Sequence, residues 1–217
     1  MILHFIASIL TAASLLCPSS FAFDTPLSDE AIREAYFLGQ RHDGSFLVDY
    51  VQTLPLPKTG PHISAITLLT PFAQLAQYSS SYMGNYSAQQ AVADHRGKKE
   101  LVKITVEIHF TASYGAMIPD QTAPARNSSP KLIPRPSDFW RDFHAEVSGG
   151  NHVLSPSSSS GRTLYSGCGR SGPCGPIGAS LELYFPAAAF SGETITIQVT
   201  PPEGDPVSVA FNPSRLR

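Results

Sequence analysis

Residues 101–110 read LVKITVEIHF, and from Val102 to Phe110 apolar and polar side chains alternate without a break. Successive side chains of a β-strand point to opposite faces of a sheet. A period of two therefore indicates one face in the core and the other in water. An α-helix would instead spread these apolar side chains around its circumference. The stretch predicts a half-buried strand.

Several further short strands are expected on both sides of this one. Their apolar residues form rows at alternate positions, for example Leu181, Leu183 and Phe185, and stretches rich in Ser, Gly, Asn and Pro separate them. The expected strands cover residues 46–54, 63–69, 139–147, 162–165, 179–185, 194–199 and 207–211. Short strands joined by short turns pair antiparallel, and two such sheets can bury their apolar faces against each other.

The helix signals lie in the N-terminal half of the chain. Ser28, Thr70 and Ser87 can each cap a helix, because a serine or threonine side chain accepts a hydrogen bond from an unpaired N–H of the first turn. The helices expected after these caps cover residues 28–40, 72–79 and 87–97.

The predicted fold class is mainly β: an antiparallel two-sheet β-sandwich with two or three short helices in its N-terminal part. Its architecture is expected to be immunoglobulin-like. The likeness concerns architecture alone, because the tryptophan and cysteine spacing of antibody domains is absent from the sequence.

Residues 1–22 contain no Lys, Arg, Asp or Glu, and their apolar stretch runs from Phe5 to Leu16. This stretch is too short to cross a hydrocarbon core of about 30 Å as a helix. Ser20-Phe21-Ala22 offers small residues where a signal peptidase cleaves. We therefore predict a signal peptide over 1–22 and a secreted or periplasmic mature chain without a transmembrane segment. Lipid attachment at Cys17 is the disfavoured alternative, because the preceding Leu16 is large.

The charges nearly balance, with 15 Lys and Arg against 17 Asp and Glu and a net charge of −2. This balance predicts no nucleic-acid partner and no attraction to an anionic membrane. The length of the mature chain suits a single domain over 23–217. Residues 112–137, which are rich in proline, are expected to form a long loop within it.

Removal of the signal peptide leaves two cysteines, Cys168 and Cys174, in a stretch rich in glycine. In an exported chain such a pair predicts a disulfide, which here would close a short loop. A metal-ligand pair and a redox pair are the alternatives, but the spacing fits neither motif. The sequence predicts no metal site and no cofactor.

The strand expected over 139–147 carries the best candidate for chemistry. Alternation places Trp140, Asp142, His144 and Glu146 on one face, and pairing with the strand at 101–110 would bring Glu107 and His109 beside them. Such a cluster could serve a metal-assisted or acid/base hydrolase. The favoured interpretation is that these are solvated positions on a sheet, with Trp140 as a weak binding candidate.

The tyrosines between Tyr78 and Tyr86 are interpreted as a linker between two helices, with a sugar-stacking loop as the alternative. Signatures of phosphate-binding loops, zinc proteases and serine hydrolases are absent from the sequence. We therefore expect a non-catalytic binding or structural module of the cell envelope or the extracellular space, with a protein or a glycan as its ligand.

Overall fold

The computed structural model describes residues 23–82, 84, 86–120, 131–150, 152–166, 174–190 and 194–217. Over these residues the chain is mixed α/β with strands predominating, which confirms the expected predominance of strands. It forms three antiparallel sheets, none of them closed, and three α-helices that lie mostly in the N-terminal part. The predicted signal peptide lies outside the described residues. Among the described residues, no helix is both long and apolar enough to cross a membrane.

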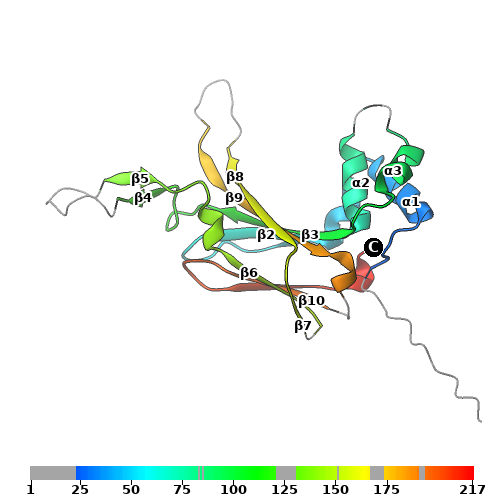
Figure 1. The fold of residues 1–217 in the computed structure, drawn as a ribbon. Coiled ribbons are helices and arrows are strands. Elements are labelled where there is room, and N and C mark those ends of the chain that lie inside the picture. Colours follow the sequence, from blue (N-terminus) through cyan, green and yellow to red (C-terminus); the bar gives the residue numbers. More distant parts are fainter. Residues whose placement is uncertain are drawn as a thin grey trace, which may run out of the picture.

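The alternating stretch forms β3 (Leu101–His109), the middle strand of the largest sheet (Figure 1). The order of this five-stranded sheet is β1-β2-β3-β9-β8. Its other strands are β1 (Val51–Thr53), β2 (His62–Leu69), β8 (Ser158–Tyr165) and β9 (Pro176–Pro186). Burial alternates along β3 from residue to residue, so the prediction of a half-buried strand is confirmed.

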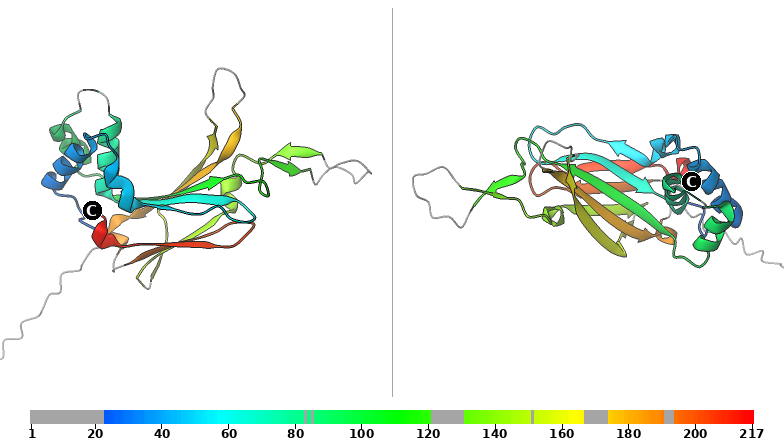
Figure 2. Two further views of the ribbon diagram at one scale, coloured as in Figure 1. Left: turned by 180° about the vertical axis from the view of Figure 1, so that it is seen from behind. Right: turned by 90° about the horizontal axis from the view of Figure 1, so that it is seen from above.

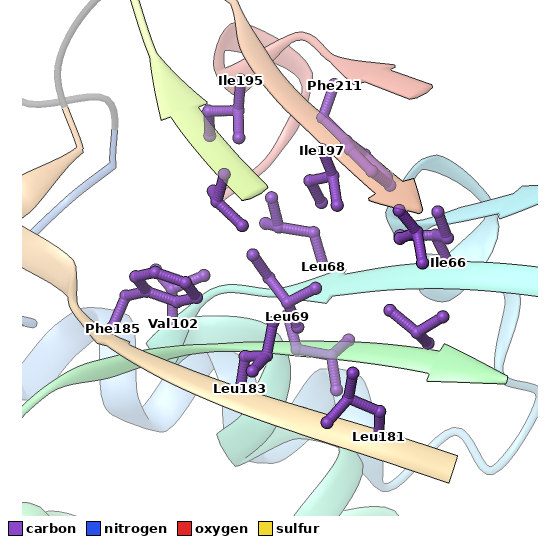
Figure 3. Close-up of a cluster of buried hydrophobic side chains, with 14 of the residues drawn as sticks. Ile66, Leu68, Leu69, Val102, Leu181, Leu183, Phe185, Ile195, Ile197 and Phe211 are labelled. Atoms are coloured by element: carbon purple, nitrogen blue, oxygen red, sulfur yellow. The ribbon is translucent and has the colours of Figure 1, made fainter. Parts of the chain in front are cut away.

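A second sheet of four strands faces the first (Figure 1). Its order is β11-β10-β6-β7, with β11 (Val207–Phe211), β10 (Ile195–Thr200), β6 (His144–Gly149) and β7 (His152–Leu154). The inward side chains of both sheets form one buried cluster, which Figure 3 shows in close-up. Ile104 and Ile108 from one sheet and Ile195 and Ile197 from the other are fully buried there. The two sheets are therefore held together by a shared apolar core.

The described part of the proline-rich segment 112–137 contains a small hairpin of β4 (Met117–Pro119) and β5 (Leu132–Pro134). This hairpin projects from the end of the sheets opposite the helices (Figure 1). At its base, the Arg135 guanidinium lies 3.7 Å from the centre of the Tyr114 ring and its Nε donates to Gly115 O at 3.0 Å. The hairpin is thus anchored by a cation–π contact at its root.

The three helices α1 (Asp29–Gly39), α2 (Pro71–Ser81) and α3 (Ala88–His95) pack together at one end of the sheets (Figure 2). Each begins after its predicted cap: Ser28, Thr70 and Ser87 accept hydrogen bonds from Ala31 N, Ala73 N and Gln90 N. The helices have a second apolar cluster of their own. A Cβ at Gly39 of α1 would meet Ala76 O of α2 at 2.1 Å, so this glycine permits close packing of the two helices.

Glu100, directly before β3, joins the helices to the sheet. Its carboxylate accepts hydrogen bonds from Thr25 Oγ1 at 2.6 Å and Leu27 N at 2.7 Å, and it contacts His95 Nε2 at 2.9 Å. Burial alone would raise the pKa of the Glu100 carboxyl. These hydrogen bonds outweigh burial and hold that pKa below its ordinary value of 4.5. The charged form of Glu100 is therefore the form that stabilises this junction.

Two expected strands differ from the structure. Residues 45–50 form a 3₁₀-helix, so only β1 remains of the strand expected over 46–54. Phe139–Asp142 is also a 3₁₀-helix, and the strand expected over 139–147 begins only at His144. Turn hydrogen bonds from Phe139 N to Pro136 O and from Arg141 N to Asp138 O replace the sheet hydrogen bonds there. Turn-forming residues before Phe139 thus outweigh the apolar alternation of the segment.

Two buried tyrosines should respond in opposite ways to loss of their hydroxyl groups. Tyr114 Oη has no hydrogen-bond partner among the described residues, whereas Tyr50 Oη donates to Arg217 O and accepts from Arg217 N. We predict that Tyr114→Phe raises the free energy of unfolding by about 1 kcal/mol and that Tyr50→Phe lowers it by a similar amount. Urea unfolding of both variants measures this. A loss of stability in Tyr114→Phe as large as in Tyr50→Phe would contradict it.

Glu100 should make stability depend on pH. Because its pKa is lower in the folded than in the unfolded chain, its contribution is fully present above pH 4.5 and is lost as the pH falls through the folded pKa. We predict that Glu100→Gln lowers the free energy of unfolding by about 2 kcal/mol at neutral pH. The difference from wild type should shrink below pH 4.5. Thermal unfolding of both proteins between neutral and acid pH tests this, and a constant difference would count against it.

Candidate functional site

The cluster expected from strand pairing does not form. Glu107 and His109 lie on β3 in the five-stranded sheet, whereas His144 and Glu146 lie on β6 in the four-stranded sheet. The expected pairing of these strands is wrong, because β3 pairs with β2 and β9 and β6 pairs with β10 and β7. Asp142 ends the 3₁₀-helix before β6.

On β3, His109 Nε2 lies 2.5 Å from Glu107 Oε1, and its ring centre lies 6.4 Å from that of His62 on β2. Among the described residues, no group of three or more His, Cys, Asp or Glu side chains could hold a metal ion. The hydrolase hypothesis thus loses the strand pairing on which it was built.

Cys174 is held in a disulfide bond. Cys168, its expected partner, lies outside the described residues, so the pairing of the two cysteines stays a prediction. The same limit applies to Cys17 in the segment before Phe23.

Trp140 lies where the 3₁₀-helix at 139–142 meets β8. Its ring covers Gly161 so closely that a Cβ added at this glycine would lie 2.2 Å from Trp140 Cδ2. Trp140 and His144 line the same cleft, with a volume of about 630 Å³, so two of the candidate residues do share a hollow.

A second hollow lies between the helices and the sheet and has a volume of about 410 Å³. Tyr78 of α2 and Tyr86, just before α3, form part of its lining. Tyr82 packs against Tyr86 in a tilted arrangement with ring centres 4.8 Å apart, and Tyr78 meets Tyr86 edge to face at 5.6 Å. Tyr36 of α1 completes the group, because its hydroxyl donates to Tyr86 O at 2.8 Å. We call Tyr36, Tyr78, Tyr82 and Tyr86 the tyrosine cluster.

Two members of the tyrosine cluster are exposed to solvent. Tyr78 is 49% and Tyr82 is 45% exposed. Neighbouring exposed aromatic groups often mark a binding surface, since rings offer large contact areas at low entropic cost. The cluster thus provides a stacking platform beside a hollow.

Charged groups complete the lining of this hollow, which we call the tyrosine pocket. Lys98, Lys99 and Asp94 contribute to it, and neither lysine forms an ion pair with a described residue. Asp94 accepts one hydrogen bond, from Gln90 Nε2 at 2.7 Å, at Oδ1. Donors and acceptors therefore lie beside apolar ring faces, as in many small-molecule sites.

The pKa values of Tyr78 and Tyr86 are both raised, and partial burial is the largest cause in each case. The nearby phenol of Tyr82 is the second cause for Tyr78, and the carboxylate of Asp94 is the second cause for Tyr86. The two phenols therefore stay protonated at neutral pH. In this form each can donate a hydrogen bond as well as stack.

The helix predicted over 72–79 already contains Tyr78, and in the structure α2 continues to Ser81, so Tyr82 directly follows its last residue. The spacing of Tyr78 and Tyr82 could have revealed their contact, because residues four apart share one face of a helix. No such helical spacing connects Tyr36, Lys98 or Lys99 with Tyr78 and Tyr82, because these three residues lie on other segments of the chain.

The chain matches no protein-family model, and no curated protein is similar to it in sequence. The geometry of the site is therefore the basis for any functional assignment.

The contact between Trp140 and Gly161 gives a direct test of this part of the structure. Trp140 is the only tryptophan of the chain, so its emission reports on this position alone. We predict that Gly161→Ala displaces the indole ring, shifts its emission to longer wavelength and lowers the free energy of unfolding by about 1 to 3 kcal/mol. Gly175→Ala is the control, because nothing lies within 4 Å of its added Cβ. Equal spectra for the two variants would contradict the packing.

Proposed function

We propose that the chain is an exported, non-catalytic binding module of the cell envelope or the extracellular space, built as an immunoglobulin-like β-sandwich with a helical part at one end. The shared apolar core of the two larger sheets supports this architecture. The uncharged, apolar residues 1–22 support export. Phe23, which would follow the cleavage site, is buried and packs on Phe190 with ring centres 5.7 Å apart. The mature chain would thus begin with a residue of the core.

The observation that carries the binding function is the open tyrosine cluster at the tyrosine pocket. We take its ligand to be a glycan, because sugar rings present C–H faces that stack on aromatic rings and hydroxyl groups that need hydrogen-bond partners. Tyr78 in the lining and Tyr82 beside it offer ring faces. Asp94, Lys98 and Lys99 of the lining offer an acceptor and two donors. A protein ligand would instead be expected to cover a surface much larger than this hollow.

A glycan array probed with residues 23–217 tests this proposal. We expect saturable binding to a restricted set of glycans. Tyr78→Ala and Tyr82→Ala should weaken it roughly five- to tenfold, because each removes one stacking partner. Tyr165→Ala is the matched control, since Tyr165 is similarly exposed but lies on β8.

Folding of each variant is checked by its unfolding curve. Equal affinities in all three tyrosine variants would reject the tyrosine cluster as the binding site. An array without any bound glycan would reject the glycan as ligand.

A further inference from the structure

The cleft beside Trp140 lies between the two larger sheets and differs in chemistry from the tyrosine pocket. Leu181 and Leu183 of β9 and Phe143 form its floor, and all three are at most 6% exposed. Trp140 forms a wall, and Ser159 of β8 also lines the cleft. The volume of about 630 Å³ falls within the range of small-molecule sites, about 300 to 1,000 Å³. The floor of the cleft is thus apolar, whereas Arg141, His144 and Ser159 add polar groups to its lining.

The rim of this cleft carries one guanidinium group. Arg141 lines it, and its guanidinium lies 5.1 Å from the centre of the Trp140 ring. The nearest carboxylate is that of Asp138, whose Oδ2 lies 3.7 Å from Arg141 Nε, and both side chains are more than half exposed. An exposed ion pair of this length contributes little, so the guanidinium can exchange it for another anion. Arg also binds carboxylates in a two-pronged geometry.

An apolar floor with one guanidinium at the rim complements a molecule that has an apolar chain and an anionic head. We propose that this cleft binds a monomeric amphipathic carboxylate, such as a fatty-acid anion. Its chain would lie against Leu181, Leu183 and Phe143, where burial of apolar surface stabilises it, and its carboxylate would pair with Arg141.

The single tryptophan makes the site directly measurable. We expect decanoate added to residues 23–217 to shift Trp140 emission in a saturable way, because the chain would exclude water from the indole. Acetate, which has the head without the chain, should cause no shift. Uncharged 1-decanol should bind about tenfold more weakly than decanoate, because it lacks the ion pair with Arg141.

Matched variants separate the cleft from general surface effects. Ser159→Phe should abolish the shift by filling the cleft, whereas Ser160→Phe should leave it unchanged. These neighbouring exposed serines pair with Leu183 and Glu182 of β9 and so lie on opposite faces of the sheet. Arg141→Gln should weaken decanoate binding about tenfold. Arg162→Gln should not change decanoate binding, because the Arg162 side chain lies on the outer face of β8, away from the cleft.

The proposal is overturned if decanoate causes no saturable shift, or if Ser159→Phe binds it as well as wild type. Equal affinity for decanoate and 1-decanol would also overturn it, because the anionic head would then play no part. A shift seen only with vesicles of phosphatidylglycerol, and not with monomeric decanoate, would overturn it in favour of a membrane surface. None of these outcomes depends on glycan binding at the tyrosine pocket.

Discussion

The alternation of β3 is the constraint on which the rest of this structure depends. Val102, Ile104, Val106 and Ile108 are fully buried on one face, so this strand must lie between a core and a polar surface. Its outer face stays polar, and Lys103 Nζ pairs there with Glu182 Oε1 on β9 at 2.7 Å. The second sheet covers the inner face with its own apolar side chains. A shift of β3 by one residue would bring its charged side chains into that core, which fixes the register of the whole sheet.

Both proposed sites lie where this layered arrangement ends. The tyrosine pocket forms where the helices meet the sheet, at the junction held by Glu100. The cleft beside Trp140 is lined by residues of the 3₁₀-helix at 139–142 and of strands from both larger sheets. At such margins, side chains from different layers cannot pack completely, and hollows with mixed chemistry result. The core therefore provides the frame, and the two hollows proposed as binding sites lie at its margins.

Prediction from the sequence succeeded where the signal was local and strong. Capping by Ser28, Thr70 and Ser87 placed the three helices, and alternation placed β3, because both depend on residues only a few positions apart. It failed at residues 139–142, where the aromatic alternation resembles a strand. There, Phe139 packs with Phe110 at a ring-centre distance of 5.0 Å from within a 3₁₀-helix, and turn hydrogen bonds determine the backbone. The same residues can be buried in either conformation, so their pattern could not distinguish the two.

The sequence by itself determined the three helices and most strands of the two larger sheets: their period, their caps and the side of each strand that is apolar. The tertiary structure decided which of these elements meet. It put His109 and His144 in different sheets, and it brought Tyr36 against Tyr86 and Trp140 against Gly161. The physical reason is that periodicity and capping arise from interactions between near neighbours in the chain. The pairing of distant strands depends instead on the free energy of the whole core. Any two strands with apolar inner faces have the same local pattern, so this pattern cannot show which of them pair.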